Sequence, residues 1–314
     1  MTAIPTSVDA AGRSSDPSQF LTSPIALGTA MGRVTAAFRE AGLDSPGLDA
    51  RRLVCWALAL DGAALWRSPE MMLGTEACAR LASACRRRLA REPVSRIVGA
   101  RHFHGLELEI GKSTLDPRPE TETLVDGVLD LVAKDLVPGG STPRILDLGT
   151  GSGAILIALL ARLRGATGLG TDISDAALAT ARRNATRHGI GQRAEFRRSS
   201  WLAAVDTAFD IVVSNPPYIA RHEIARLAPE VREHDPLAAL DGGTDGIDAY
   251  RAILAGLSGR IARGGWLVLE VGDGQAEAVA QLVIAANCAP ALELSGVWTD
   301  LSGIRRCVAA RARS

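Results

Sequence analysis

The stretch RILDLGTGSGAILIALLARL, Arg144–Leu163, contains a short apolar strand, a glycine-rich turn and an apolar helix in direct succession. Gly149, Gly151 and Gly153 occupy alternate positions of the turn. Glycine allows the backbone to turn tightly and a ligand to approach closely, and the first turn of a helix has N–H groups without a partner inside the helix. This stretch therefore predicts a ligand-binding turn between a strand and a helix.

The same alternation of strand and helix continues along the chain. Further strand patterns lie at 166–172, 194–198, 209–214 and 264–272, and a helical pattern lies at 174–189. Such alternation predicts an α/β fold with a parallel sheet that is covered by helices on both faces. The last segment, 292–312, has two strand-like runs with no helix between them, so we expect an antiparallel pair that closes the sheet.

An acidic residue, Asp172, ends the second of these strands, about twenty residues after the glycines. A carboxylate at this position can accept hydrogen bonds from both hydroxyls of a ribose. The combination predicts a nucleoside cofactor. The spacing alone does not choose the cofactor, because Gly149, Gly151 and Ala154 also satisfy the dinucleotide fingerprint.

The strand at 209–214 ends at Asn215, Pro216, Pro217 and Tyr218. In a doubly wound sheet this strand neighbours the one at 144–148, so we expect the motif to face the glycine turn. The Asn215 side-chain oxygen and the Pro216 carbonyl can both accept from one planar NH2 group, and the prolines offer no competing N–H. The motif therefore predicts an acceptor site for an amide or an aromatic amine, with the Tyr218 ring against its flat face.

Such a nitrogen is a poor nucleophile because its lone pair is delocalised, and fixing its two hydrogens aims that lone pair. S-Adenosylmethionine is the natural electrophile, since its sulfonium needs no acid to leave. Positioning of this kind contributes several kcal/mol, within a ceiling of roughly 7 to 11 kcal/mol for ideal alignment. No general base is required, because the methylated nitrogen becomes acidic and loses its proton to water.

The chain divides into four predicted parts. Residues 1–23 are predicted to be a disordered tail, 24–93 a small helical domain, 94–140 a hairpin and connector, and 141–314 the α/β domain. The helical domain follows from apolar residues at three- and four-residue spacing. The hairpin follows from the alternating pattern of SRIVGARHFHGLELEIG, 95–111, around a glycine-bearing turn.

Composition limits the possible partners and compartments. Thirty-five basic and 35 acidic residues cancel, so we expect no stable binding of nucleic acid. Five scattered cysteines form no C-x-x-C pair, which predicts neither disulfides nor a zinc site and favours the cytoplasm. No apolar run reaches the roughly 18 residues of a membrane span, so no membrane association is expected. No metal site is expected at the histidines of the hairpin.

From about Ala26 to Arg311 the sequence resembles the release factor glutamine N5-methyltransferases, also called PrmC or HemK. The resemblance rests on LDARRLVCWAL, REPVSRIVGARHFHGLEL, PRPETETLVD, ILDLGTGSGAILIAL, TDISDAALATARRNA, SNPPYI, EVREHDPLAALDGGTDGIDAYR, GGWLVLEVGDGQ and DLSGIRRCVAAR. It implies a Rossmann-like class I S-adenosylmethionine-dependent methyltransferase sheet with a small N-terminal helical domain. It also implies methyl transfer from S-adenosylmethionine to the glutamine of the Gly-Gly-Gln loop of bacterial-type peptide chain release factors.

The resemblance also implies roles for individual residues. Cofactor contacts fall on the glycine turn, on the ribose-binding carboxylate, on a tryptophan against adenine and on an asparagine that bridges cofactor and substrate: Gly149, Thr150, Gly151, Ser152, Gly153, Asp172, Trp201 and Asn215. Catalytic contacts fall on Asn215, Pro216, Pro217 and Tyr218. Ser200 stands where the family usually has an acidic residue before the tryptophan.

Some assignments stay open at this stage. Arginines of CRRRLAREP, among them Arg86, Arg87, Arg88 and Arg91, belong either to a docking surface or to a solvated helix face. A cofactor-side role for Thr121 or Glu122 is a hypothesis. Other activities compatible with parts of the pattern are methylation of a ribosomal protein glutamine, N6-adenine methylation of nucleic acid, NAD-dependent oxidoreduction, which leaves Asn215 to Tyr218 unexplained, and binding without turnover.

Overall fold

The computed structural model describes residues 17–138 and 140–314, and the chain separates into two compact units, Met1–Val98 and Gly99–Ser314. The tail predicted for 1–23 lies outside the described residues up to position 16. The predicted hairpin and connector mostly fall within the second unit, together with the α/β domain. Each unit has its own hydrophobic core.

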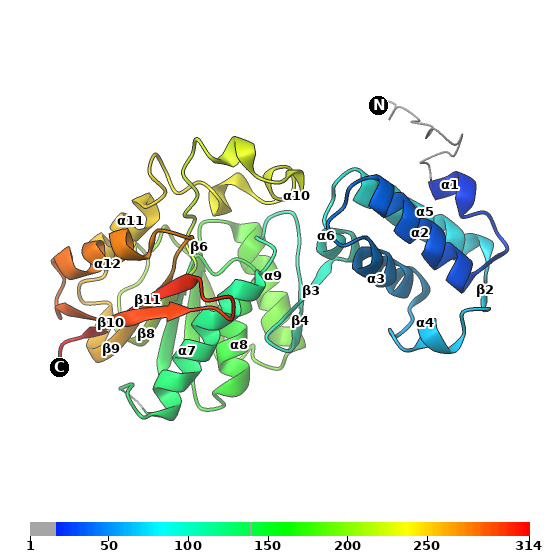
Figure 1. The fold of residues 1–314 in the computed structure, drawn as a ribbon. Coiled ribbons are helices and arrows are strands. Elements are labelled where there is room, and N and C mark those ends of the chain that lie inside the picture. The colour runs from blue at the N-terminus through cyan, green and yellow to red at the C-terminus, as the bar shows by residue number, and fades with distance from the viewer. Residues whose placement is uncertain (1–16, 139) are drawn as a thin grey trace. The chain divides into compact units, whose positions relative to one another are not determined.

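The first unit is helical (Figure 1). Amphipathic helices bury one face each, as Val34 and Phe38 of the second helix illustrate, both fully buried. Its elements are α1 (Pro17–Phe20), β1 (Ile25–Ala26), α2 (Leu27–Glu40), α3 (Pro46–Leu58), α4 (Ala64–Arg67), β2 (Met72–Leu73), α5 (Thr75–Leu89) and α6 (Val94–Val98).

Three expectations for this unit are corrected. Residues 17–23 are not part of a tail, because α1 forms there and Leu21 is buried in the core. Residues 95–98 are helical and not the start of a hairpin strand, because Val94 and Ile97 share one buried face at helical spacing. Arg88 is not on a surface, since its Nε lies 2.8 Å from Asp49 Oδ2 with both side chains nearly buried.

The second unit is built on a seven-stranded sheet with the order β10-β11-β9-β8-β5-β6-β7. Its elements are β3 (Ala100–Phe103), β4 (Leu106–Glu109), η1 (Pro119–Thr121), α7 (Glu122–Ala133), β5 (Arg144–Leu148), α8 (Ala154–Arg162), β6 (Thr167–Asp172), α9 (Asp175–Arg187), β7 (Ala194–Arg198), β8 (Phe209–Ser214), η2 (Ile224–Arg226), α10 (Pro229–Arg232), η3 (Leu237–Ala239), α11 (Asp248–Gly256), β9 (Ile261–Glu270), α12 (Ala276–Ala285), β10 (Leu292–Thr299) and β11 (Arg305–Ala312).

Alternating side chains of the strands bury both faces of this sheet. Ile145 of β5 packs with α7, α8 and α9, whereas Leu146 packs with α11 and α12. The same alternation holds for Ile211 and Val212 of β8. Figure 1 shows these helices on the two faces of the sheet. The predicted α/β fold is therefore confirmed, and its strands are apolar in sequence because neither face meets water.

The order of the strands places a switch point beside β5. β5 pairs in parallel with both β6 and β8, and β8 pairs in parallel with β9. β10 and β11 add as an antiparallel pair on the far side of β9, as the final segment predicts. Ligands of such sheets bind at the carboxyl ends of the strands at the switch point, which here means the ends of β5 and β8.

Two further findings concern the whole described chain. No helix within residues 17–138 and 140–314 is both long and apolar enough to cross a membrane. All five cysteines are free thiols.

Packing between α7 and β10 generates a test of this fold. A Cβ added at Gly127 would lie 2.1 Å from a ring carbon of Trp298, so we expect Gly127→Ala to lower the free energy of unfolding by about 1–3 kcal/mol. The loss would occur even though alanine favours a helix by about 1 kcal/mol.

The matched control is Gly32→Ala in α2, where an added Cβ meets nothing within 4 Å. This change is expected to stabilise the first unit by roughly 0.5–1 kcal/mol. Scanning calorimetry measures both effects. A Gly127→Ala protein that melts like the wild type would contradict the packing described here.

Candidate active site

The glycine turn between β5 and α8 adopts a conformation that only glycine accepts without strain. Gly149, Gly151 and Gly153 have φ values of 72°, 58° and 82°. The backbone N–H groups of Gly149 and Thr150 both donate to the Thr171 carbonyl at 2.8 Å, which ties the turn to β6. The turn is thus held against the neighbouring strand, and the N-terminus of α8 opens beside it.

A buried acid lies below the turn. Asp147 of β5 is 1% exposed, and its Oδ2 accepts a hydrogen bond of 2.6 Å from the Thr150 hydroxyl. Burial raises the pKa of Asp147 to about 7, while the hydrogen bond from Thr150 lowers it. Sequence reasoning missed Asp147, although an acidic residue inside an apolar strand was a visible signal.

Asp172 joins the turn to the start of α9. Its Oδ2 accepts from the Gly151 N–H and its Oδ1 from the Ser174 N–H, each at 2.9 Å. Each carboxylate oxygen can accept more than one hydrogen bond, so the group keeps capacity toward a ligand. Asp172 therefore both orders the glycine turn and presents acceptors beside it.

Most of the glycine turn and Asp172 line a cavity of about 490 Å³ at the switch point. This volume lies within the roughly 300 to 1,000 Å³ of small-molecule sites. The lining comes from the glycine turn, the ends of β6, β7 and β8, and the connectors before α7 and after α10: Ser113, Leu115, Pro117, Arg118, Thr121, Gly149, Thr150, Gly151, Ser152, Ala154, Ile155, Asp172, Ile173, Ser174, Ser199, Trp201, Asn215, Pro217, Pro236, Ala238 and Ala239.

Apolar groups of this cavity offer surfaces for a flat ring. Trp201 lies against the turn, since a Cβ at Gly149 would be 3.6 Å from its ring. Ile173 is an apolar side chain 54% exposed at the end of β6. Ser199 lines the cavity, and the exposed Ser200 does not. The departure from the family at position 200 therefore lies outside the lining.

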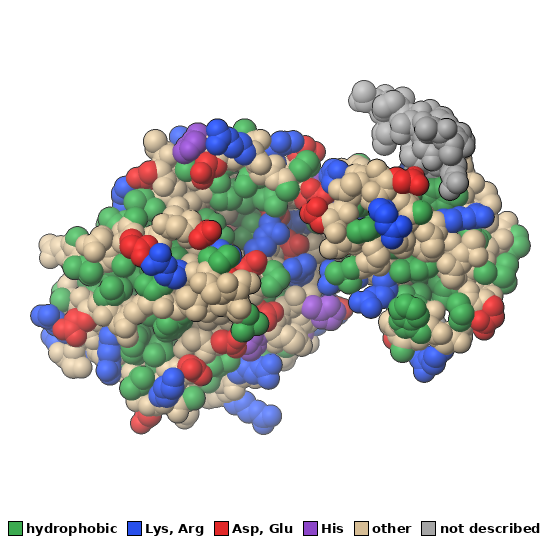
Figure 2. Space-filling view, viewed as in Figure 1, with side chains coloured by type: hydrophobic (Ala, Val, Ile, Leu, Met, Phe, Trp, Pro, Cys, Tyr) green, Lys and Arg blue, Asp and Glu red, His purple; other side chains and the backbone are tan. Residues whose placement is uncertain are grey.

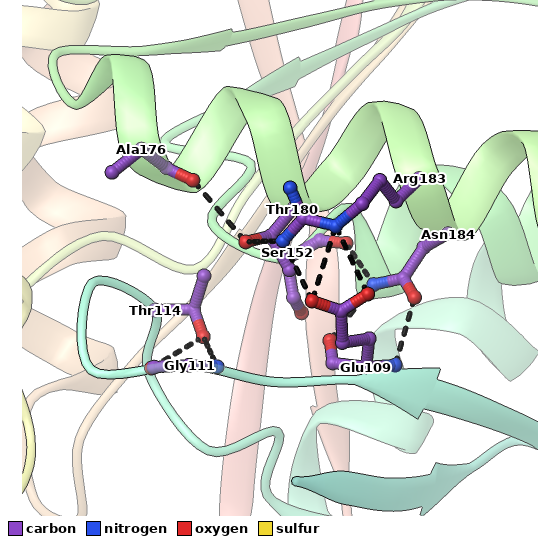
Figure 3. Close-up of polar contacts among 8 residues, drawn as sticks. All are labelled: Glu109, Gly111, Thr114, Ser152, Ala176, Thr180, Arg183 and Asn184. Atoms are coloured by element: carbon purple, nitrogen blue, oxygen red, sulfur yellow. Dashed lines mark hydrogen bonds and ion pairs between the residues drawn. The ribbon is translucent and has the colours of Figure 1, made fainter.

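The hairpin β3–β4 braces the glycine turn through one buried amide (Figure 3). Asn184 of α9 donates from Nδ2 to the carbonyls of Glu109 and Ser152, each at 2.9 Å, and its Oδ1 accepts from the Glu109 N–H at 2.7 Å. The Glu109 carboxylate pairs with Arg183 on the same helix. Hairpin, helix and turn are therefore locked together.

A second, smaller cavity of about 210 Å³ adjoins the first and shares Asn215 with it. Leu115, Arg118, Asn215 and Ala239 line both cavities, whereas Tyr218 lines only the second. The rest of the second lining is apolar: Ile219, Leu227, Val231 and Leu240. Arg118 is held in place by Asp235, with Nη2 and Oδ2 2.6 Å apart.

Side-chain hydrogen bonds and closely packed glycines hold the Asn-Pro-Pro-Tyr segment in place. The Asn215 Nδ2 donates to the Thr121 hydroxyl at 3.1 Å. The Gln275 Nε2 donates to the Tyr218 carbonyl at 2.8 Å. Gly242 and Gly246 pack on the same segment so closely that added Cβ atoms would lie 2.8 Å from the Tyr218 Cα and 2.5 Å from its carbonyl oxygen, respectively.

Two of the residues assigned from the sequence to cofactor or catalytic contacts line neither cavity, Gly153 and Pro216. Packing explains why glycine occupies position 153, because an added Cβ would lie 2.8 Å from Ile157 of α8. Of the connector residues raised as hypotheses, Thr121 lines the larger cavity. Glu122 instead accepts from the His104 N–H at 2.8 Å and holds the hairpin turn.

The larger cavity fits S-adenosylmethionine in its chemistry. Backbone N–H groups at the start of α8 suit the carboxylate of the methionine end, Asp172 suits the ribose hydroxyls, and Trp201 and Ile173 suit the adenine ring. When bound, this cofactor supplies a methyl group on a positively charged sulfur.

Comparisons with known proteins agree with this geometry. The family model of the PrmC N-terminal domain matches residues 29–99, and that of the methyltransferase small domain matches residues 123–231. The release factor glutamine methyltransferase of Bradyrhizobium diazoefficiens is 47% identical over 88% of this chain and 92% of its own length. That of Rhodospirillum rubrum is 43% identical over 95% of this chain and 89% of its own length.

Among solved structures, the hMettl16 catalytic domain in complex with an RNA hairpin matches with a TM-score of 0.51 and 19% identity, over 66% of this chain and 75% of that one. At this identity the likeness concerns the fold alone. Together, fold and cavity define a class I methyltransferase that uses S-adenosylmethionine. The chain belongs to the release factor glutamine methyltransferase family.

The support behind Tyr218 can be tested separately from cofactor binding. Gly246→Ala places a Cβ 2.5 Å from the Tyr218 carbonyl at a φ of +79°, so we expect methyl transfer to fall at least about tenfold while cofactor affinity stays within about threefold. Gly259→Ala is the control, since Gly259 has a similar φ of +72° and an added Cβ meets nothing within 4 Å. Equal activity of the two variants would argue against this role for the contact.

Burial of Asp147 predicts a pH dependence of stability. Because the folded pKa of about 7 exceeds the ordinary value of 3.8, the folded state holds a proton that the unfolded chain loses between these pH values. The free energy of unfolding should therefore fall as pH rises from about 4 to 7, by at most about 1.4 kcal/mol per pH unit for this group. Denaturant titrations of Asp147→Asn across this range should show a smaller fall than the wild type.

Proposed function

We propose that this protein transfers a methyl group from S-adenosylmethionine to the side-chain nitrogen N5 of the glutamine in the Gly-Gly-Gln motif of peptide chain release factors. The observation that carries the proposal is the position of Asn215, which lines both the larger cavity and the smaller one. A residue there can contact a cofactor on one side and a substrate side chain on the other. Membership of the family supports the choice of a glutamine as that side chain.

The residues assigned to the cofactor are those of the glycine turn and the ends of the neighbouring strands: Gly149, Thr150, Gly151, Ser152, Gly153, Asp172, Trp201 and Asn215. All but Gly153 line the larger cavity, and Gly153 shapes the turn through its φ of +82°. Helix N-termini favour negatively charged groups, so the start of α8 suits the carboxylate of the methionine end.

The residues assigned to the glutamine amide are Asn215, Pro216, Pro217 and Tyr218. The Asn215 Oδ1 and the Pro216 carbonyl accept from the two hydrogens of the amide, and the Tyr218 ring supports its face. Burial raises the pKa of Tyr218 to about 12, so its hydroxyl stays protonated at neutral pH. The segment therefore positions and polarises the amide without acting as a base.

The electrostatics favour transfer to a neutral nitrogen. Positive charge moves from sulfur to the amide nitrogen, and oxygen acceptors around that nitrogen stabilise the charge where it develops. The proton leaves afterwards, because an N-methylated amide cation is strongly acidic. Orientation of the amide against the methyl group compensates for the low nucleophilicity of the amide nitrogen.

A protein substrate also suits the first unit. Its large apolar side chains Leu48, Trp56, Trp66 and Met72 are exposed, and Trp66 is 78% exposed. Exposed apolar side chains of this kind are more typical of protein partners than of nucleic acid. On the face shown in Figure 2, basic and acidic side chains are interspersed over both units, in keeping with a net charge of zero. A release factor as partner would place the reaction in the cytoplasm.

The experiment that tests this function measures transfer of labelled methyl groups from S-adenosylmethionine. The acceptors are a purified release factor, the same factor with the Gly-Gly-Gln glutamine changed to alanine, a ribosomal protein preparation and an adenine-containing oligonucleotide. We expect label only on the intact release factor. We also expect at least about a hundredfold loss of transfer for Asn215→Ala, with cofactor binding retained.

Other outcomes identify other functions. Label on ribosomal protein would support glutamine methylation but reject a release factor as the substrate. Label on the oligonucleotide would reject the amide substrate in favour of an adenine amine, and the base would then have to leave its stack to reach Asn215. Cofactor binding without transfer to any acceptor would reject catalysis.

A further inference from the structure

One buried acid at the active-site edge has no role in the function proposed so far. Glu270 is the last residue of β9 and is 2% exposed. It lies between β8 and β11, with Cys307 of β11 opposite it in the sheet. Within the described chain, its Oε2 is buried and has no hydrogen-bond partner. A buried carboxyl with an unused oxygen is costly, and such groups are kept mainly where they serve a site.

The carboxyl lies behind the acceptor segment. Strand β8 ends at Ser214, which is paired with Leu269, so Glu270 and Asn215 are the next residues of two adjacent parallel strands. The Thr121 and Asn215 side chains lie close enough to the Glu270 carboxyl to lower its pKa as hydrogen-bond donors. The Asn215 Nδ2 also donates to the Thr121 hydroxyl at 3.1 Å. The three side chains form one network.

The network determines which way the amide of Asn215 points. A side-chain amide has a donor end and an acceptor end of nearly the same shape, and its surroundings decide between the two orientations. A carboxylate and a hydroxyl that accept hydrogen bonds attract the NH2 end and repel the oxygen. The amide oxygen is therefore turned away from Glu270 and toward the cavities. A reversed amide would present hydrogens to the hydrogens of the substrate.

Charged and titratable groups on every element packed around Glu270 influence its ionisation. Burial is the largest effect and raises the pKa of Glu270 to about 7, and the Glu120 charge of η1 also raises it. The Thr121 and Asn215 side chains and Arg306 of β11 lower it. Tyr218, Cys307 and Tyr250 of α11 also face Glu270, and the Tyr250 hydroxyl donates to its backbone carbonyl at 2.9 Å. Burial is the main cause that raises the pKa of each of these three groups, and the Glu270 charge raises it further. Arg306 also forms an ion pair with Asp300, whose Oδ2 lies 2.9 Å from the Arg306 Nε.

We propose that Glu270 is a positioning residue that, together with Thr121, holds the Asn215 amide with its oxygen toward the substrate. The proposal rests on the function proposed above, since it explains how an acceptor is presented to an amide NH2. Glu270 itself touches no reactant. In its protonated form the acid can donate a hydrogen bond, so the orientation of Asn215 is held less firmly.

A test that needs no substrate uses the side-chain amide signals of asparagine. The chain has only three asparagines, Asn184, Asn215 and Asn287, so a protein labelled with [15N]asparagine gives a spectrum that the Asn215→Ala variant assigns. We expect the Asn215 amide signals to shift with pH around a midpoint near 7, and the shift to vanish in Glu270→Gln. The Asn184 signals serve as the internal control. A shift that is absent from the wild type, or that persists in Glu270→Gln, would overturn the proposal.

The kinetic test compares two replacements of Glu270. Glu270→Met removes the acceptor at similar volume, and we expect kcat to fall at least about tenfold with the affinity for S-adenosylmethionine within about twofold. Glu270→Gln keeps one acceptor oxygen, so it should retain more activity than Glu270→Met. In the wild type we expect kcat to rise with pH around neutrality as Glu270 ionises, and Glu270→Gln should lose this rise. Glu277→Gln on the exposed face of α12 is the control for loss of a carboxylate.

The outcomes separate the two proposals. An active wild type with an unchanged kcat in Glu270→Met would overturn the positioning role alone. A joint loss of cofactor binding and activity in Glu270→Met, with Glu270→Gln titrating like the wild type, would assign Glu270 a merely structural role. A wild type that methylates no release factor would reject the proposed function, while the asparagine spectra would still report whether Glu270 orients Asn215.

Discussion

The parallel pairing of β5 with β8 is the constraint on which the rest of the site depends. Leu148 lies opposite Ser214 at the ends of the two strands, and the Ser214 hydroxyl donates to the Leu148 carbonyl at 2.7 Å. The residues that follow, Gly149 and Asn215, therefore emerge side by side at one edge of the sheet. A ligand bound at the glycine turn is therefore next to the acceptor segment.

This edge concentrates polar groups that a sheet covered on both faces otherwise excludes. Asp147 is the residue before the last of β5 and Glu270 is the last of β9, and both are buried. Burial raises the pKa of each to about 7. Water-excluded dipoles act more strongly on a reacting group than solvated ones do, and they need no reorganisation during the reaction. A neutral amide that has to attack a methyl group benefits from such surroundings, because its own nucleophilicity is low.

The supports of the site come from distant parts of the second unit. Asn184 of α9 joins the hairpin to the glycine turn, Gln275 holds the Tyr218 carbonyl, and Gly246 leaves room for the same backbone. Thr121, just before α7, completes the contact with Asn215. Because each support belongs to a helix terminus, a strand end or a packed turn, the acceptor segment is set by rigid elements although it is itself a loop.

The sequence by itself determined what depends on local chemistry and on order along the chain. Apolar strands alternating with helices predicted the doubly wound sheet, and the glycines, Asp172 and Asn215 to Tyr218 were visible because each residue type suits its task at its spacing. Tertiary structure decided the rest. Residues 95–98 became helical because Val94 and Ile97 found a core to bury in. Thr121, Asn215 and Glu270 are far apart in sequence, so only the strand order β9-β8-β5 and the packing of the segment before α7 brought them together.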